Sequence, residues 1–248
     1  LEAAMHLQRW GQHPVVTWLG DEASAPEDAR ASLARARSAG VTFSTTPPEG
    51  LSPDDLCIDA LLGIGATRAP QGRMADWLRT LQASPAPVLA VDLPSGLNAE
   101  TGNFAPDSIA GDDHSTMGSW QIQAENTLSL LSCKPGLFTA YGRDAAGTVW
   151  FDDLGVDSSA EPACAWTNGA PVPAHRLHVS HKGTRGDVAV IGGECLSRRG
   201  LGMTGAALLA ASAALHGGAG RVLVSLFDDG TMTLDPALPE LMFRRFEA

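Results

Sequence analysis

The sequence has little basic charge and almost no lysine. Lys134 and Lys182 are its two lysines, and the other basic residues in the total of 17 Lys and Arg are arginines. With 28 acidic residues, the formal net charge at pH 7 is -11. Nucleic acids and anionic membranes bind basic surfaces, so we expect neither as a partner. The negative net charge does not exclude small anionic ligands, because backbone amides and helix N-termini can bind them.

Cysteine is scarce and scattered. The four cysteines are Cys57, Cys133, Cys164 and Cys195, and none belongs to a C-x-x-C pair. This spacing disfavours a zinc site or a redox dithiol and is typical of reduced thiols, which predicts a cytoplasmic protein. No apolar run is long enough to span a bilayer, and no basic start followed by an apolar core marks a signal peptide.

Several catalytic signatures are missing. The sequence has no G-x-S-x-G elbow, no Walker loop and no H-E-x-x-H helix, so those chemistries have no support. His175, His178 and His181 are spaced by three and would share one face of a helix, as metal ligands can. Pro171 and Pro173 precede them, however, and "HRLHVS" lacks a helical pattern. We therefore predict no metal site at these histidines.

Apolar runs alternate with helical patterns along most of the chain. The predicted helices cover 1–11, 25–40, 74–83 and 202–220, and the predicted strands lie in 14–20, 41–45, 55–62, 88–93, 126–138, 147–156, 186–193 and 221–227. This alternation predicts an α/β fold with a parallel sheet covered on both faces. The runs 55–62, 88–93 and 186–193 are apolar enough to predict buried strands.

The composition changes at 158–174, which is rich in Ser, Pro, Ala and Gly. We interpret this segment as a linker between a first domain, 1–157, and the beginning of a second, 175–248. A chain of 248 residues is long enough for two units. It opens without an initiator Met, and 175–248 is short for a closed core, so we expect both domains to be incomplete in this stretch.

Two predicted strands each carry an aspartate near a glycine-bearing end. Asp59 lies in "CIDALLGIG" and Asp92 in "VLAVDLPSG". Ligands of open parallel sheets bind outside the carboxyl ends of the strands, and two neighbouring carboxylates there repel each other unless positive charge is near. A monovalent cation, or donors such as Ser95 and Thr67, would resolve the conflict. The alternative is that each aspartate caps the turn that follows it.

Gly63 and Gly65 follow the first of these strands. Such glycines allow backbone amides to approach a phosphate, although a plain turn explains G-I-G equally well. Lys134 and Lys182 precede glycine-bearing turns in "CKPGLF" and "HKGTRG". A lysine kept where the chain otherwise uses arginine indicates a position that needs a compact charge, with chance as the alternative.

The motifs together resemble a known family. "DALLGIG", "APVLAVDLPSGLNAETG", "LSCKPGLF" and "VWFDDLGV" resemble, in this order, the epimerase domain of the bifunctional NAD(P)H-hydrate repair enzymes, which are YjeF-related. "HKGTRGDVAVIGG", "GMTGAALLAASAALHGGAG" and "LPELM" resemble the start of their dehydratase domain. The resemblance implies a Rossmann-like three-layer domain followed by the start of a ribokinase-like α/β domain.

The resemblance also implies an activity. Water adds to the reduced nicotinamide ring and gives a hydrate in R and S forms; an epimerase interconverts them, and a dehydratase removes water from the S form at the expense of ATP or ADP. Hydrated NADH or NADPH is then the substrate, and potassium and ATP or ADP are the cofactors, with Mg2+ as a further candidate. We expect a homo-oligomer.

Carried over position by position, the resemblance makes Asp59 and Ser95 potassium ligands. It makes Asp92 a catalytic carboxylate that contacts the substrate. Ala206 becomes a substrate contact at the start of the dehydratase helix. The loop that wraps the hydrated dinucleotide is formed by Gly63, Ile64, Gly65, Ala66, Thr67, Arg68 and Ala69.

Three departures qualify this resemblance. The family's N-N-G-G-D-G loop belongs immediately before Leu1, and its phosphate-binding loop and catalytic aspartate belong beyond Ala248. The segment 112–126 differs from the family's usual approach to its lysine strand. Two alternatives therefore stay open: a ribokinase-like kinase of a small alcohol or vitamin, and a non-catalytic nucleotide-binding module with the epimerase fold. The residues before Leu1 and after Ala248 would distinguish them.

Overall fold

The computed structural model describes residues 1–105, 121–170, 177–196, 200, 202–228, 230 and 232–245. The chain divides into two compact units, Leu1–Thr167 and Asn168–Ala248. Their boundary falls inside the predicted linker 158–174, while the domain limits 1–157 and 175–248 remain predictions. His175 and most of the segment 112–126 lie outside the described residues.

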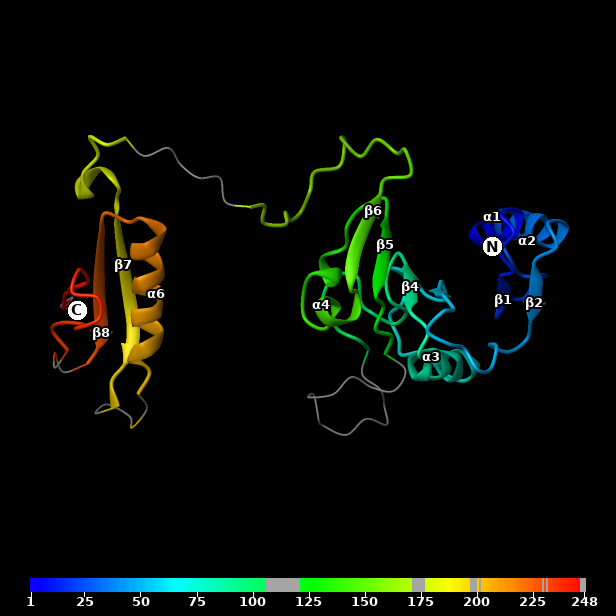
Figure 1. The fold of residues 1–248 in the computed structure, drawn as a ribbon, viewed down its shortest axis with the longest axis horizontal. Helices are drawn as coiled ribbons and strands as arrows, with labels where there is room; N and C mark the ends of the chain where they lie inside the picture. The colour runs from blue at the N-terminus through cyan, green and yellow to red at the C-terminus, as the bar shows by residue number, and fades with distance from the viewer. Residues whose placement is uncertain are drawn as a thin grey trace. The chain divides into compact units, whose positions relative to one another are not determined.

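The first unit begins with two helices and a small sheet. Helices α1 (Glu2–Arg9) and α2 (Glu27–Ser38) accompany strands β1 (Val15–Thr17) and β2 (Thr42–Ser44), which pair in parallel (Figure 1). The side chains of Ala4, Met5, Ala36 and Val41 form their shared core. All four predicted elements of this region are confirmed.

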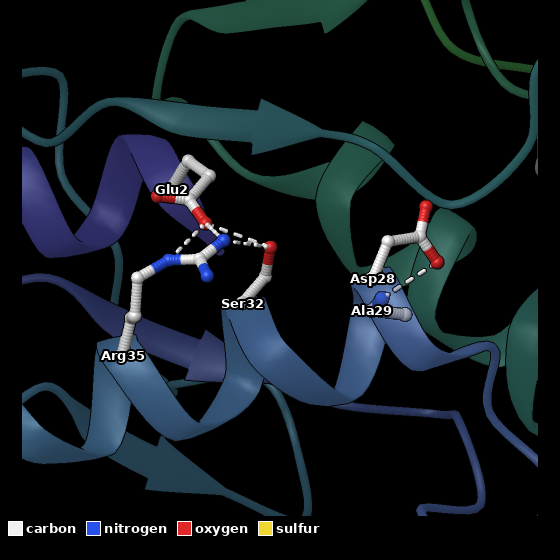
Figure 2. A network of polar contacts seen from close by, with 5 residues as sticks. All are labelled: Glu2, Asp28, Ala29, Ser32 and Arg35. Carbon is white, nitrogen blue, oxygen red and sulfur yellow. Dashed lines mark hydrogen bonds and ion pairs between the residues drawn. The ribbon is translucent and has the colours of Figure 1, made fainter.

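A polar network joins the two helices (Figure 2). The Glu2 carboxylate accepts hydrogen bonds from Ser32 Oγ at 2.7 Å and Arg35 Nε at 2.9 Å. Asp28, in the first turn of α2, accepts the N–H of Ala29 at 2.8 Å. Acidic residues thus lie at the start of α2 and arginines near its end, as the helix dipole favours.

The main sheet of the first unit has four parallel strands in chain order. They are β3 (Cys57–Asp59), β4 (Val88–Val91), β5 (Asn126–Leu130) and β6 (Thr148–Asp152). Helix α3 (Arg73–Ala83) connects β3 to β4, and a 3-10 turn η1 (Pro135–Leu137) and the short helix α4 (Gly142–Ala145) lie between β5 and β6. The core is lined by Leu78, Val88, Ala90, Leu93, Leu97, Ile122 and Leu137.

In the residues that the structure describes, the second unit contains a smaller parallel sheet with a helix packed against it. Strands β7 (Asp187–Glu194), β8 (Arg221–Phe227) and β9 (Met242–Phe243) follow a short 3-10 turn η2 (Lys182–Thr184). Helix α6 (Thr204–Gly217) buries small residues such as Ala207 and Ala211 against β8. His181 caps η2, with its Nδ1 accepting the Gly183 N–H at 3.2 Å.

The predicted α/β fold with parallel strands is confirmed, with two corrections. The run 55–62 was expected to be a buried strand, but β3 has three residues, and Leu56 and Ile58 are 59% and 39% exposed. The run 186–193 was also expected to be buried, but Ile191 in β7 is 61% exposed. Among the strands that the structure describes, β3 and β7 lie at the edges of their sheets, so fewer neighbouring side chains cover these residues. Within the described residues, no helix is long and apolar enough to cross a membrane.

Candidate functional site

The two aspartates singled out by the sequence lie at one edge of the main sheet. Asp59 is the last residue of β3 and is paired with Ala90, and Asp92 directly follows the end of β4. Because β3 and β4 are parallel, both carboxylates belong to the carboxyl edge, where open sheets bind ligands.

Asp59 is buried, and Ser95 supplies two of its hydrogen bonds. The side chain accepts the Ser95 N–H at 2.8 Å and the Ser95 Oγ–H at 2.6 Å, and more weakly the Leu61 N–H at 3.4 Å. Burial raises the pKa of the Asp59 carboxyl, and the hydrogen bonds from Ser95 and Leu61 oppose this rise. A positive charge at this carboxylate would oppose it further.

Asp92 sits in a different environment. Its backbone has φ +72°, a left-handed conformation that Asp adopts more readily than most residues. Its N–H donates to the carbonyl of Leu128 at 2.7 Å, and its Oδ1 accepts the Leu130 N–H at 3.3 Å and forms an ion pair with Lys134. These contacts of the carboxylate come from β5 and the segment after it, and not from the turn that Asp92 precedes.

Lys134 is the site residue that sequence reasoning did not place. It lies 42 residues after Asp92, so the distance between the two residues along the chain gives no sign of their ion pair. Its Nζ also donates to the Leu130 carbonyl at 2.6 Å and to Ser129 Oγ at 3.4 Å. A signal was available: Lys134 follows the strand that neighbours β4, so the carboxyl ends of both strands share an edge.

The proposed nucleotide loop, Gly63–Ala69, follows β3 and is largely exposed. Its first turn is closed by the Ala66 N–H, which donates to the Gly63 carbonyl at 3.1 Å. A Cβ added at Gly63 would lie 3.6 Å from Asp92 Oδ2, whereas one added at Gly65 would meet nothing within 4 Å. The loop therefore begins beside Asp92 and leaves open backbone for a ligand to approach.

The structure does not bring every candidate together. Thr67, considered as a further oxygen donor, is exposed in the loop, and Arg68 and Ile64 are exposed there as well. Ala206 lies in the first turn of α6, exposed, and belongs to the second unit. The site on this sheet edge thus consists of two contacting pairs, Asp59 with Ser95 and Asp92 with Lys134, and Gly63 lies beside Asp92.

Proteins that are similar to the chain include two bifunctional repair enzymes and an epimerase. "Bifunctional NAD(P)H-hydrate repair enzyme Nnr" of Escherichia coli (strain K12) is 35% identical over 241 residues, which cover 92% of this chain and 42% of the relative. The protein of the same name from Vibrio cholerae is 30% identical over 236 residues, covering 92% and 44%. "NAD(P)H-hydrate epimerase" of Oenococcus oeni is 34% identical over 146 residues, covering 58% and 63%. The chain therefore spans less than half the length of the two bifunctional relatives.

The site lies within a region that matches a defined family. Residues 1–136 match the family described as "YjeF-related protein N-terminus". This match includes Asp59, the loop Gly63–Ala69, Asp92, Ser95 and Lys134, and it covers more than half of the chain. The chain therefore belongs to the YjeF-related family.

Proposed function

We propose that the first unit catalyses the interconversion of the R and S hydrates of NADH and NADPH. The observation that carries this proposal is the state of Asp92: one carboxylate oxygen is anchored, and the other faces the exposed loop at Gly63. This arrangement lies at the ligand-binding edge of a parallel sheet. The names of the relatives, hydrate repair enzyme and hydrate epimerase, supply the substrate class.

The chemistry asks for a base at the hydroxyl group of the hydrate. Water adds to the carbon bonded to the ring nitrogen, because the nitrogen lone pair stabilises the cation that water attacks. Asp92 accepts the hydroxyl proton. The O–H electron pair then forms a C=O bond, the C–N bond breaks, and its electron pair passes to the nitrogen. Reclosure on the opposite face reverses these steps and returns the proton, so no co-reactant is consumed.

Asp59 and Ser95 are the proposed ligands of a potassium ion. A carboxylate and a hydroxyl are hard oxygen donors, which suit such a cation. Ser95 Oγ donates to Asp59 and accepts the Leu62 N–H at 2.9 Å, which leaves one lone pair for a metal ion. The raised pKa of the buried Asp59 carboxyl supports the same proposal, because a cation would stabilise its charge. Further oxygen ligands would come from outside this pair.

For the longer protein we propose a second activity, dehydration of the S hydrate with ATP or ADP, aided by Mg2+. The two relatives named bifunctional match across 92% of the chain, which includes most of the second unit. Ala206, in the first turn of α6, is the proposed substrate contact in that unit. A cytoplasmic location and a homo-oligomeric state also remain predictions.

An assay with the full-length protein tests the proposed epimerase. The protein is incubated with purified R hydrate, and conversion to S is followed by chromatography without any nucleoside triphosphate. We expect conversion above the spontaneous rate, and a rate lower by on the order of a hundredfold or more for Asp92→Asn. Tight binding of the hydrate with no acceleration by the wild-type protein would favour the non-catalytic binding module instead.

A further inference from the structure

The ammonium group of Lys134 is fully occupied by protein acceptors. A lysine has three N–H donors and no acceptor. Its Nζ contacts Asp92 Oδ1, the Leu130 carbonyl at 2.6 Å and Ser129 Oγ at 3.4 Å. The side chain is 11% exposed. No donor is left for a ligand, so Lys134 can act on a substrate only through one of these partners.

The two oxygens of Asp92 have separate roles. Oδ1 receives both Lys134 and the Leu130 N–H. Oδ2 points toward Gly63, and among the described residues no hydrogen bond to it is found. The backbone beneath is also fixed, because the Asp92 N–H donates to the Leu128 carbonyl at 2.7 Å. The carboxylate is therefore held at one oxygen and open at the other.

We propose that Lys134 is a positioning residue of this site: it fixes Oδ1 and thereby aims Oδ2 of Asp92 at the hydroxyl group of the hydrate. The inference rests on the proposed epimerase function. In the step, Oδ2 takes the hydroxyl proton while the C–N bond of the substrate breaks, and it returns the same proton on reclosure. Lys134 keeps all three of its protons throughout.

A lysine suits this role better than an arginine. Its three acceptors converge on one nitrogen, and an ammonium is a compact charge with rotatable donors. A guanidinium is a planar fork that would spread the donors apart. This explains why the sequence keeps a lysine here although almost all of its other basic residues are arginines.

Three variants of the full-length protein test the inference: Lys134→Met, Lys134→Arg and the double variant Lys134→Met with Asp92→Asn. We expect Lys134→Met to lower kcat for R-to-S conversion by about tenfold to a hundredfold with little change in KM, since misplacing a catalytic group costs rate more than binding. Lys134→Arg keeps the positive charge, but its kcat should be no higher than that of Lys134→Met. The double variant should be no slower than Asp92→Asn alone, because Lys134 acts through Asp92.

Lys182→Met is the matched control, since it removes the other lysine, which is exposed in the second unit, and we expect its kcat to be unchanged. If Lys134→Met does not fold, as judged by thermal unfolding, Lys134→Gln keeps two N–H donors without the charge and should show the same losses. A kcat equal to that of the wild type in a folded Lys134 variant would overturn the inference. So would a kcat of the double variant that is lowered by the product of the two single-variant effects. Failure of the proposed function itself would be seen separately, as no epimerisation by the wild-type protein.

Discussion

Ser95 holds both oxygens of Asp59: its backbone N–H donates to Oδ2 at 2.8 Å, and its hydroxyl donates to Oδ1 at 2.6 Å. The two residues are 36 positions apart: Asp59 ends β3, and Ser95 lies in the turn that follows β4. The same hydroxyl accepts the Leu62 N–H at 2.9 Å, so it also ties down the start of the loop after β3. One side chain therefore connects the proposed cation site to the proposed substrate loop.

Ser95→Ala should destabilise the fold. It removes a hydrogen bond to a buried charged group and leaves the Leu62 N–H without this acceptor, which together cost about 2–3 kcal/mol. Urea unfolding measures the loss. Ser52→Ala is the control, because Ser52 makes the same serine-to-aspartate contact with Asp55 at 2.8 Å on the exposed surface, where we expect no comparable effect. Equal losses of unfolding free energy in the two variants would show that the buried Ser95–Asp59 pair stabilises the fold no more than the exposed pair does.

Asp59 predicts a pH dependence of stability. Because burial raises the pKa of its carboxyl above the ordinary 3.8, the folded protein binds this proton more tightly than the unfolded chain does. Protonated Asp59 contributes fully to the free energy of unfolding below pH 3.8, the ordinary pKa of the group. This contribution is lost as the pH rises through the raised pKa of the folded protein. We expect the stability of wild type relative to Asp59→Asn to fall as the pH rises from 3.8 through the raised pKa of the folded protein, in tetramethylammonium chloride.

Potassium should reduce that fall. A bound cation favours the ionised carboxylate, so replacing tetramethylammonium chloride with potassium chloride at equal ionic strength should flatten the difference between wild type and Asp59→Asn. The measurement is again urea unfolding across the same pH range. The same pH dependence of the stability difference in both salts would contradict a potassium ion at Asp59. A stability difference that increases with pH would contradict the raised pKa of Asp59.

Gly63 and Gly65 offer a matched pair of substitutions. Neither has a positive φ, and an alanine Cβ meets Asp92 Oδ2 at an ordinary 3.6 Å in the first case and nothing within 4 Å in the second. Both variants should fold normally. Gly63→Ala places a methyl group beside the open oxygen, so we expect kcat/KM for R-to-S conversion to fall about tenfold or more, while Gly65→Ala changes it less. A larger effect of Gly65→Ala than of Gly63→Ala would indicate that the substrate does not bind beside Asp92.

The fate of the hydroxyl oxygen distinguishes two routes of epimerisation. A base at Asp92 opens the ring and keeps the oxygen on its carbon, whereas departure of the hydroxyl as water requires a proton donor beside it. Lys134, with all three donors engaged, does not supply one. Turnover in water enriched in oxygen-18, followed by mass spectrometry, should therefore give a largely unlabelled S hydrate. One labelled oxygen for each conversion would point to loss and re-addition of water.

Sequence reasoning succeeded where local pattern decides structure. The acidic start and arginine-rich end of α2, and the alternation of helix and strand along the chain, are short-range properties that indicate element type and parallel strand direction. The two aspartates were also located at one sheet edge, because the carboxyl ends of neighbouring parallel strands lie together.

What failed depends on which elements are neighbours. The exposure of Ile58 and Ile191 follows from the edge positions of β3 and β7, which an apolar run does not encode. The pairing of Lys134 with Asp92 depends on β5 lying beside β4 and on the course of the chain after Leu130, where Leu131 has φ +64°. Neither the strand order nor that turn is visible in the spacing of the two residues.

The left-handed backbone of Asp92 limits how this position can change during evolution. Glycine, asparagine and aspartate tolerate φ +72° best, so glutamate, the usual exchange for aspartate, is disfavoured there. Asparagine keeps an acceptor for Lys134 and loses the base. Since aspartate and asparagine codons differ by one nucleotide, a single base change would remove the proposed base and leave a side chain that fits this backbone. The residue at this one position therefore separates candidate enzymes from candidate binders among related sequences.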